Sequence, residues 1–93
     1  MERADIAIIG TGPAGVSAAI TAKVRGKTVL LFGSQELSSK LTKAHKIQNY
    51  PGLPDIDGAQ LAQAFKKHLD VLEIPITEKQ VTAVYAMGGY FGI

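Results

Sequence analysis

The chain has 93 residues, of which 46% are hydrophobic and 19% charged, and its formal net charge is +2. This composition predicts one packed domain, because disordered chains combine low hydrophobicity with high net charge. So small a charge gives no reason to expect nucleic acid or a membrane surface as a partner. The absence of cysteine excludes disulfides, thiolate metal sites and a Cys-x-x-Cys redox pair within these residues. No metal site is expected.

The first residues run directly into a strand pattern, which leaves no room for a signal peptide. No apolar run approaches the roughly 18 residues that would span a bilayer. We therefore expect a cytoplasmic protein without membrane contact.

The first 33 residues predict a parallel βαβ unit over 4–33. A short apolar run, 4–9, has the composition of a parallel strand that is buried on both faces. Small and apolar residues at helical spacing over 13–25 predict a helix, with Pro13 in its first turn and Gly26 after its end. The run 27–32 predicts the second strand, and two parallel strands with a short helical connection require a right-handed crossover.

Between the first strand and the helix lies Gly10-Thr11-Gly12-Pro13-Ala14-Gly15, which matches the Gly-x-Gly-x-x-Gly pattern of dinucleotide-binding folds. Gly10 permits the tight turn, Gly12 lets a pyrophosphate approach the backbone, and Gly15 lets helix and strand pack closely. The free N–H groups of the helix N-terminus then stabilise the phosphates. The pattern alone is common, but its place between strand and helix favours a dinucleotide site over a purely structural turn.

The acidic residue that usually follows the second strand and binds the ribose hydroxyls is replaced by Gly33. Glu36 takes this role only if the following loop folds back. The expected ribose contact is therefore weaker than the pyrophosphate contact.

A long connection over 34–56 shows no sustained periodicity, which is typical of a functional loop. It carries a cluster of basic residues, Lys40, Lys43, His45 and Lys46. A solvated loop is the first interpretation of this cluster, and contact with phosphate or with an acidic partner is the alternative.

The remaining residues, 57–93, predict a helix, a strand and a hairpin. Asp57 and Gln60 form a capping-box pattern ahead of a helix whose apolar face includes Leu61 and Phe65. Strands are expected at 74–76 and 80–85, and Gly88-Gly89 predicts a two-residue turn into a strand over 90–93. This last strand has nothing to pair on its far side, so the sequence indicates one partial, truncated domain over 1–93.

A second segment, Lys40 to Gly52, resembles the thioredoxin reductase family of FAD- and NAD(P)-dependent oxidoreductases. In that family a Gly-Gln-Leu stretch and threonines lead into an acidic-Asn-aromatic-Pro-Gly turn, which Asn49-Tyr50-Pro51-Gly52 matches in part. A helix, a strand and the start of a β-meander follow in both. The chain departs from the family at Ser39-Lys40, at Lys43-Ala44-His45 and at Gln48.

The resemblance implies an α/β, Rossmann-like, three-layer fold that binds FAD, with NAD(P)H as the reductant of the intact enzyme. It places Gly10, Gly12, Pro13 and Ala14 at the pyrophosphate and Gly33 and Ser34 at the ribose. It also places Lys40, Leu41 and Asn49 on the flavin side, and the Val81 backbone at the adenine. No catalytic residue is expected here, because the family's dithiol and NADPH domain follow later in sequence. These residues alone are therefore expected to be inactive.

Two alternatives stay open. An NAD-dependent dehydrogenase would share the glycine loop, but it leaves Gly33 and the Asn49 turn unexplained. A non-enzymatic nucleotide-binding module, dimerising through the sheet edge after Ile93, is the other.

Overall fold

The computed structural model describes residues 3–37 and 39–93. Its elements are, in chain order, β1 (Ile6–Ile9), α1 (Pro13–Val24), β2 (Val29–Phe32), α2 (Ser39–Thr42), α3 (Gly58–Val71), β3 (Ile76–Thr77), β4 (Tyr85–Ala86) and β5 (Phe91–Gly92). No helix in this described part is both long and apolar enough to cross a membrane.

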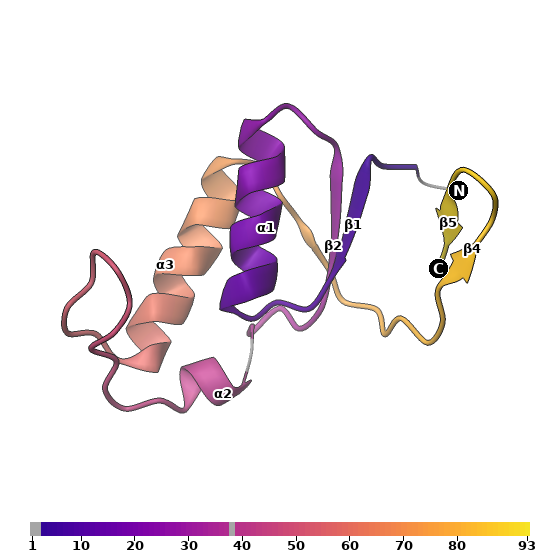
Figure 1. Ribbon diagram of the computed structural model, residues 1–93. Coiled ribbons are helices and arrows are strands. Elements are labelled where there is room, and N and C mark those ends of the chain that lie inside the picture. The colour runs from indigo at the N-terminus through magenta and orange to yellow at the C-terminus, as the bar shows by residue number, and fades with distance from the viewer. Residues whose placement is uncertain (1–2, 38) are drawn as a thin grey trace.

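A parallel three-stranded sheet has the order β1-β2-β3, so β2 lies in the middle. Ile6 is opposite Val29 in the first pair, and Leu31 is opposite Ile76 in the second. Figure 1 shows α1 and α3 side by side on one face of this sheet, while the β4-β5 hairpin lies beyond the other face. The expected α/β Rossmann-like class and the βαβ unit are confirmed.

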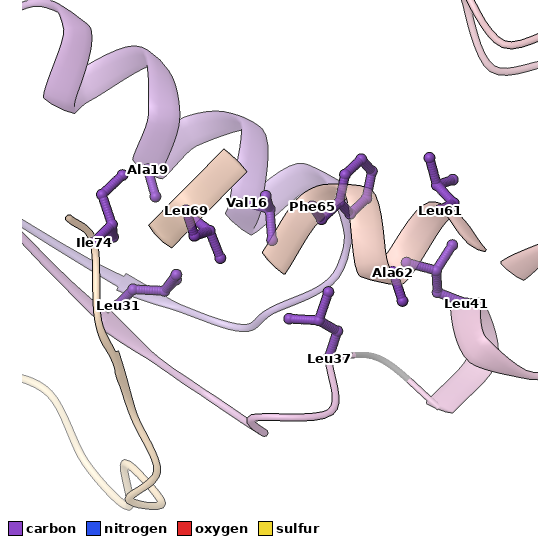
Figure 2. Packing of buried hydrophobic residues seen from close by; sticks show 10 residues of the cluster. All are labelled: Val16, Ala19, Leu31, Leu37, Leu41, Leu61, Ala62, Phe65, Leu69 and Ile74. Carbon is purple, nitrogen blue, oxygen red and sulfur yellow. The ribbon is translucent and has the colours of Figure 1, made fainter. Parts of the chain in front are cut away.

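The core lies between the two long helices and the sheet (Figure 2). α1 contributes small residues, Val16 and Ala19, which let it lie close to β2. α3 contributes larger ones from the face that the sequence predicts, and Leu61 and Leu69 are each 1% exposed. Its N-terminus has the predicted capping box, in which the Asp57 carboxylate accepts a hydrogen bond from the Gln60 N–H at 2.8 Å. Burying each large aliphatic side chain stabilises the fold by about 1.5–3 kcal/mol.

The expectation that β1 is buried on both faces is wrong for the described residues. Ile8 packs against the core, but its neighbour Ile9 points to the opposite face and is 56% exposed. Ile6 is 39% exposed. The two long helices lie on one face of the sheet (Figure 1), and the opposite face is left exposed at Ile9.

The C-terminal hairpin has the predicted turn. Tyr85 pairs with Gly92, and the Met87 N–H donates to the Tyr90 carbonyl at 2.8 Å, which closes a two-residue loop. Gly88 and Gly89 have φ angles of 68° and 116°, which glycine adopts without steric cost.

Other expected boundaries need correction, and the strand predicted at 74–76 lies instead at Ile76–Thr77. The strand predicted over 80–85 is reduced to Tyr85–Ala86, because 81–84 makes no strand pairing. The connection over 34–56 holds the short helix α2 and two isolated bridges, Ile47 with Ile56 and Tyr50 with Leu53.

A polar clamp joins the start of β1 to the start of β2. The Asp5 N–H donates to the Thr28 hydroxyl at 2.8 Å, and the Thr28 N–H donates to the Asp5 carboxylate at 2.9 Å. This backbone hydrogen bond, with a second from the Thr28 hydroxyl, lowers the pKa of Asp5 below its ordinary value of 3.8. Lys27 adds a smaller electrostatic effect in the same direction, and desolvation opposes it.

We expect this clamp to make stability depend on acidity. A carboxyl group whose pKa is lower in the folded state stabilises the fold above its unfolded pKa, and that stabilisation is lost as pH falls below 3.8 toward the folded value. Asp5→Asn should therefore flatten the decline of the unfolding free energy between about pH 5 and about pH 2, measured by urea denaturation. The matched control is Asp55→Asn at another exposed carboxylate, and an equal flattening there would contradict the assignment to Asp5.

Candidate functional site

The glycine loop and the end of β2 meet at one edge of the sheet. The Gly10 N–H donates to the Phe32 carbonyl at 2.8 Å, and the Gly33 N–H donates to the Thr77 carbonyl at 3.1 Å. These bonds fix the turns that leave β1 and β2 beside each other. Ligands of open parallel sheets bind at this carboxyl edge.

Helix α1 begins in this loop without a capping side chain. Gly12 is its N-cap residue, Pro13 follows in the first turn, and no acidic residue stands there. The Ala14 and Gly15 N–H groups are therefore left without an intrahelical partner. Together with the helix dipole they favour an anionic group, such as a phosphate, placed at the loop.

Gly12 and Gly15 are glycines for different physical reasons. Gly12 has φ −78° and ψ −178°, an extended conformation open to any residue, so its backbone does not require glycine. A Cβ on Gly15, in contrast, would overlap the Gly10 carbonyl oxygen. Gly15 thus lets α1 pack onto β1, as predicted, while nothing in the backbone conformation of Gly12 calls for glycine.

The structure explains why the usual acidic residue is missing after β2. A Cβ on Gly33 would lie 2.5 Å from Cγ2 and 2.8 Å from Oγ1 of Thr11. Thr11 is only 5% exposed, and its hydroxyl donates to the Ser34 carbonyl at 3.1 Å. Its side chain therefore occupies the space that a residue with a Cβ would need at position 33.

The Ser34 carbonyl accepts two hydrogen bonds, from the Thr11 hydroxyl and from the Leu37 N–H at 3.0 Å. Leu37 is buried and has a left-handed φ of 66°, so the chain turns sharply back into the core. Glu36 lies within this turn, exposed, and its N–H donates to the Ser34 hydroxyl at 3.2 Å. The chain turns toward the core at Leu37, and contact between Glu36 and a ribose stays a prediction.

The residues predicted on the flavin side lie in two different parts of the structure, on α2 and on the segment 47–56. Lys40 and Leu41 lie on α2, near the N-terminal ends of α1 and α3 (Figure 1). Lys40 is exposed, but Leu41 is 8% exposed and belongs to the core. Asn49 is exposed on the segment 47–56, which loops out beside α3.

Val81, the predicted adenine contact, is half-buried in 78–84, which leaves the sheet on the side away from α3. The structure thus brings together Gly10, Gly12, Pro13, Ala14, Gly15, Gly33 and Ser34, with Lys40 and Leu41 at the same end of the fold. Asn49 and Val81 lie to opposite sides of this group.

Sequence reasoning missed the role of Thr11. Its position between two motif glycines does not by itself indicate this role. The useful pattern is the threonine together with the glycine after β2, because the threonine side chain fills the space that a Cβ at that glycine would take. It also missed the contact between α2 and α3. The Gly58 N–H donates to the Ala44 carbonyl at 2.7 Å, and a Cβ on Gly58 would overlap the Leu41 carbonyl oxygen.

Comparison with known proteins identifies a family for nearly the whole chain. The family model described as pyridine nucleotide-disulphide oxidoreductase matches residues 4–89. A ferredoxin-flavin thioredoxin reductase from Clostridium acetobutylicum has a similar structure, with a TM-score of 0.93 and 55% identity over 98% of this chain and 32% of that chain. The thioredoxin reductase of Streptococcus pyogenes has a TM-score of 0.86 and 28% identity, over 95% of this chain and 29% of that one.

A relative found by sequence agrees with these structural matches. The thioredoxin reductase of Ureaplasma parvum is 36% identical over 73 residues, which is 78% of this chain and 23% of the relative. The chain therefore spans less than a third of the length of each of these thioredoxin reductases.

Proposed function

We propose, because the chain belongs to the pyridine nucleotide-disulphide oxidoreductase family, that it forms the FAD-binding part of a thioredoxin reductase-like flavoenzyme. In this proposal residues 1–93 are one partial FAD-binding domain, with the βαβ unit at 4–33. When bound, the flavin would accept electrons from a donor and pass them to a disulfide of the acceptor. We also propose that the protein is cytoplasmic and forms a homodimer.

The observation that carries the proposal is the uncapped N-terminus of α1 behind Gly12. Within residues 3–37 and 39–93 no side chain caps this helix end, and Gly12 has backbone angles that other residues could adopt. Both features fit a pyrophosphate that lies against the loop. Pro13 and Ala14 would flank it, and Ser34 and Gly33 would approach the neighbouring ribose.

Two features of the chain support FAD rather than NAD in this proposal. A dehydrogenase that binds NAD normally places a carboxylate after β2, whereas this chain has Gly33 there and the Thr11 side chain lies in the space that a Cβ would take. Lys40 and Asn49 on the connection supply polar groups for the flavin side. Leu41 would support this site from the core, because its own side chain is buried.

The electron donor is proposed to be a reduced ferredoxin. This choice rests on 55% identity to a ferredoxin-flavin thioredoxin reductase, against 28% to the Streptococcus thioredoxin reductase. NAD(P)H, the donor that the family name and the sequence resemblance imply, is the second candidate.

The test begins with the natural full-length protein purified under gentle conditions. We expect a yellow protein whose heat-released cofactor is FAD by mass spectrometry. Anaerobic flavin bleaching with reduced ferredoxin, NADPH or NADH then identifies the donor. A colourless protein that binds NAD tightly would contradict the proposal in favour of a dehydrogenase. One that binds neither nucleotide would favour a non-enzymatic module.

A further inference from the structure

A basic surface adjoins the proposed cofactor site, and of its residues only Lys40 is assigned to that site. Lys43, His45 and Lys46 are all exposed, and Lys40 extends the surface onto α2. We refer to these four residues as the basic patch. Within the described part of the chain, no carboxylate forms an ion pair with any of them. The positive charge of the three lysines is therefore available to a partner.

The carboxylates near the patch in sequence, Glu36, Asp55 and Asp57, form no ion pair with it in the described part of the chain. Asp57 lines the same surface hollow as Lys43 and His45, a space of about 450 Å³. Its carboxylate, however, accepts the Gln60 N–H and caps α3, whose positive dipole end it faces. Asp55 is exposed, on the other side of the Ile47–Ile56 bridge from the patch.

The backbone beneath the basic patch is held at several points. The Ala44 N–H donates to the Leu41 carbonyl at 3.1 Å, and the Ala44 carbonyl accepts the Gly58 N–H at 2.7 Å. Ile47 and Ile56 exchange two hydrogen bonds, of 2.7 and 3.2 Å. Surface lysines on a backbone fixed in this way lose less entropy on binding than lysines on a mobile loop.

The basic patch lies close in sequence to the residues proposed for the flavin side of the cofactor site. Lys43, His45 and Lys46 stand between Lys40 and Asn49, the two exposed residues proposed for the flavin side. Figure 1 shows α2 and the chain that follows it at the same end of the fold as the N-terminus of α1. A protein docked on this surface would lie next to the flavin end of the proposed cofactor site.

We propose that the basic patch is the docking surface for a small acidic electron-carrier protein that reduces the flavin. The inference rests on the proposed function and adds the place at which the donor binds. A protein fits better than a small anion, because the side chains are exposed and spread along the chain from Lys40 to Lys46 rather than buried around one point. Charges at the rim of an interface chiefly raise the association rate of a complementary partner.

The test measures the second-order rate of flavin reduction in the natural full-length, FAD-loaded protein. An acidic ferredoxin, reduced chemically and mixed by anaerobic stopped flow, is the probe. We expect Lys43→Glu with Lys46→Glu to lower this rate at least about 10-fold at low ionic strength. The difference should shrink as salt rises from about 20 to about 300 mM, because salt screens exposed charges.

The matched control is Lys66→Glu with Lys67→Glu, an equal charge change on exposed residues of α3. These lie eight and nine residues beyond the start of that helix at Gly58, about 12 Å along its axis at 1.5 Å per residue. At about 150 mM salt, where the Debye length is about 8 Å, the control should change the rate less than about twofold, because its charges are displaced by more than that length. Reduction of the flavin by dithionite should be equal in all three proteins, which shows that the cofactor site is intact.

Three results would overturn the inference. Equal loss in both double variants would mean that only net charge matters. An unchanged rate in the Lys43 and Lys46 variant would remove the docking site but leave the proposed function standing. A failure of the wild-type protein would be read from its cofactor: with FAD bound but no reduction by ferredoxin, it would refute the proposed donor and the docking surface, and with no FAD it would refute the proposed function.

Discussion

Gly12→Val should abolish FAD binding while leaving the fold intact. The valine methyl groups would occupy the space in front of the first-turn N–H groups of α1, where the pyrophosphate is proposed to lie. Each lost charge-assisted hydrogen bond costs about 1.5–3 kcal/mol. A loss of two such bonds weakens binding by more than about 100-fold, since about 1.4 kcal/mol corresponds to a factor of ten. The flavin-to-protein absorbance ratio after gel filtration measures the loss.

The free energy of unfolding of the Gly12→Val variant should hardly differ from that of the parent. Gly12 has backbone angles that valine adopts readily, so the substitution adds no strain to the turn. Ala18→Val makes a similar change on an exposed position of α1, away from the loop. It should keep full flavin content and lose only about 0.5 kcal/mol of helix propensity. Undiminished flavin in the Gly12 variant would refute the pyrophosphate assignment.

The features that sequence predicted well depend on local chemistry. Gly88-Gly89 between two short apolar runs needs only backbone preferences to form its turn, and Asp57 with Gln60 forms its capping box within a single helical turn. The glycine loop is similar, since strand, turn and helix follow one another without interruption. The whole βαβ unit could therefore be inferred from its own residues.

The features that sequence missed depend on distant parts of the chain. Thr11 and Gly33 are 22 positions apart, and their complementarity appears only when β1 and β2 lie side by side. The exposure of Ile9 has a related cause. An apolar strand shows that both faces are suited to burial, but it does not say which segment covers each face, and the described residues cover only one.

The burial of Leu41 changes the interpretation of the connection over 34–56. The family resemblance places this residue on the flavin side, but its side chain packs into the core beside α3. Its backbone therefore matters more than its side chain for the proposed site. The connection is a loop anchored to α3, and that anchoring holds both Lys40 and the basic patch.

Gly58→Ala tests this anchoring and should destabilise the protein by about 3 kcal/mol. Gly58 is the first residue of α3, where helix propensity alone predicts that alanine gains up to about 1 kcal/mol. The tertiary contact predicts the opposite sign. The alanine Cβ would overlap the Leu41 carbonyl oxygen and crowd the Ala44 carbonyl at 2.9 Å. Both obstacles are backbone atoms, so no change of rotamer relieves them.

The overlap can be relieved only if α3 moves away from the segment after α2. Such a movement would break the hydrogen bond from the Gly58 N–H to the Ala44 carbonyl and displace Lys43 and His45 with it. Urea denaturation measures the loss of stability, with Ala64→Val on an exposed position of α3 as the control that adds bulk without this contact. A Gly58 variant as stable as the parent would show that the loop is not anchored here. The rigid support inferred for the basic patch would then be lost.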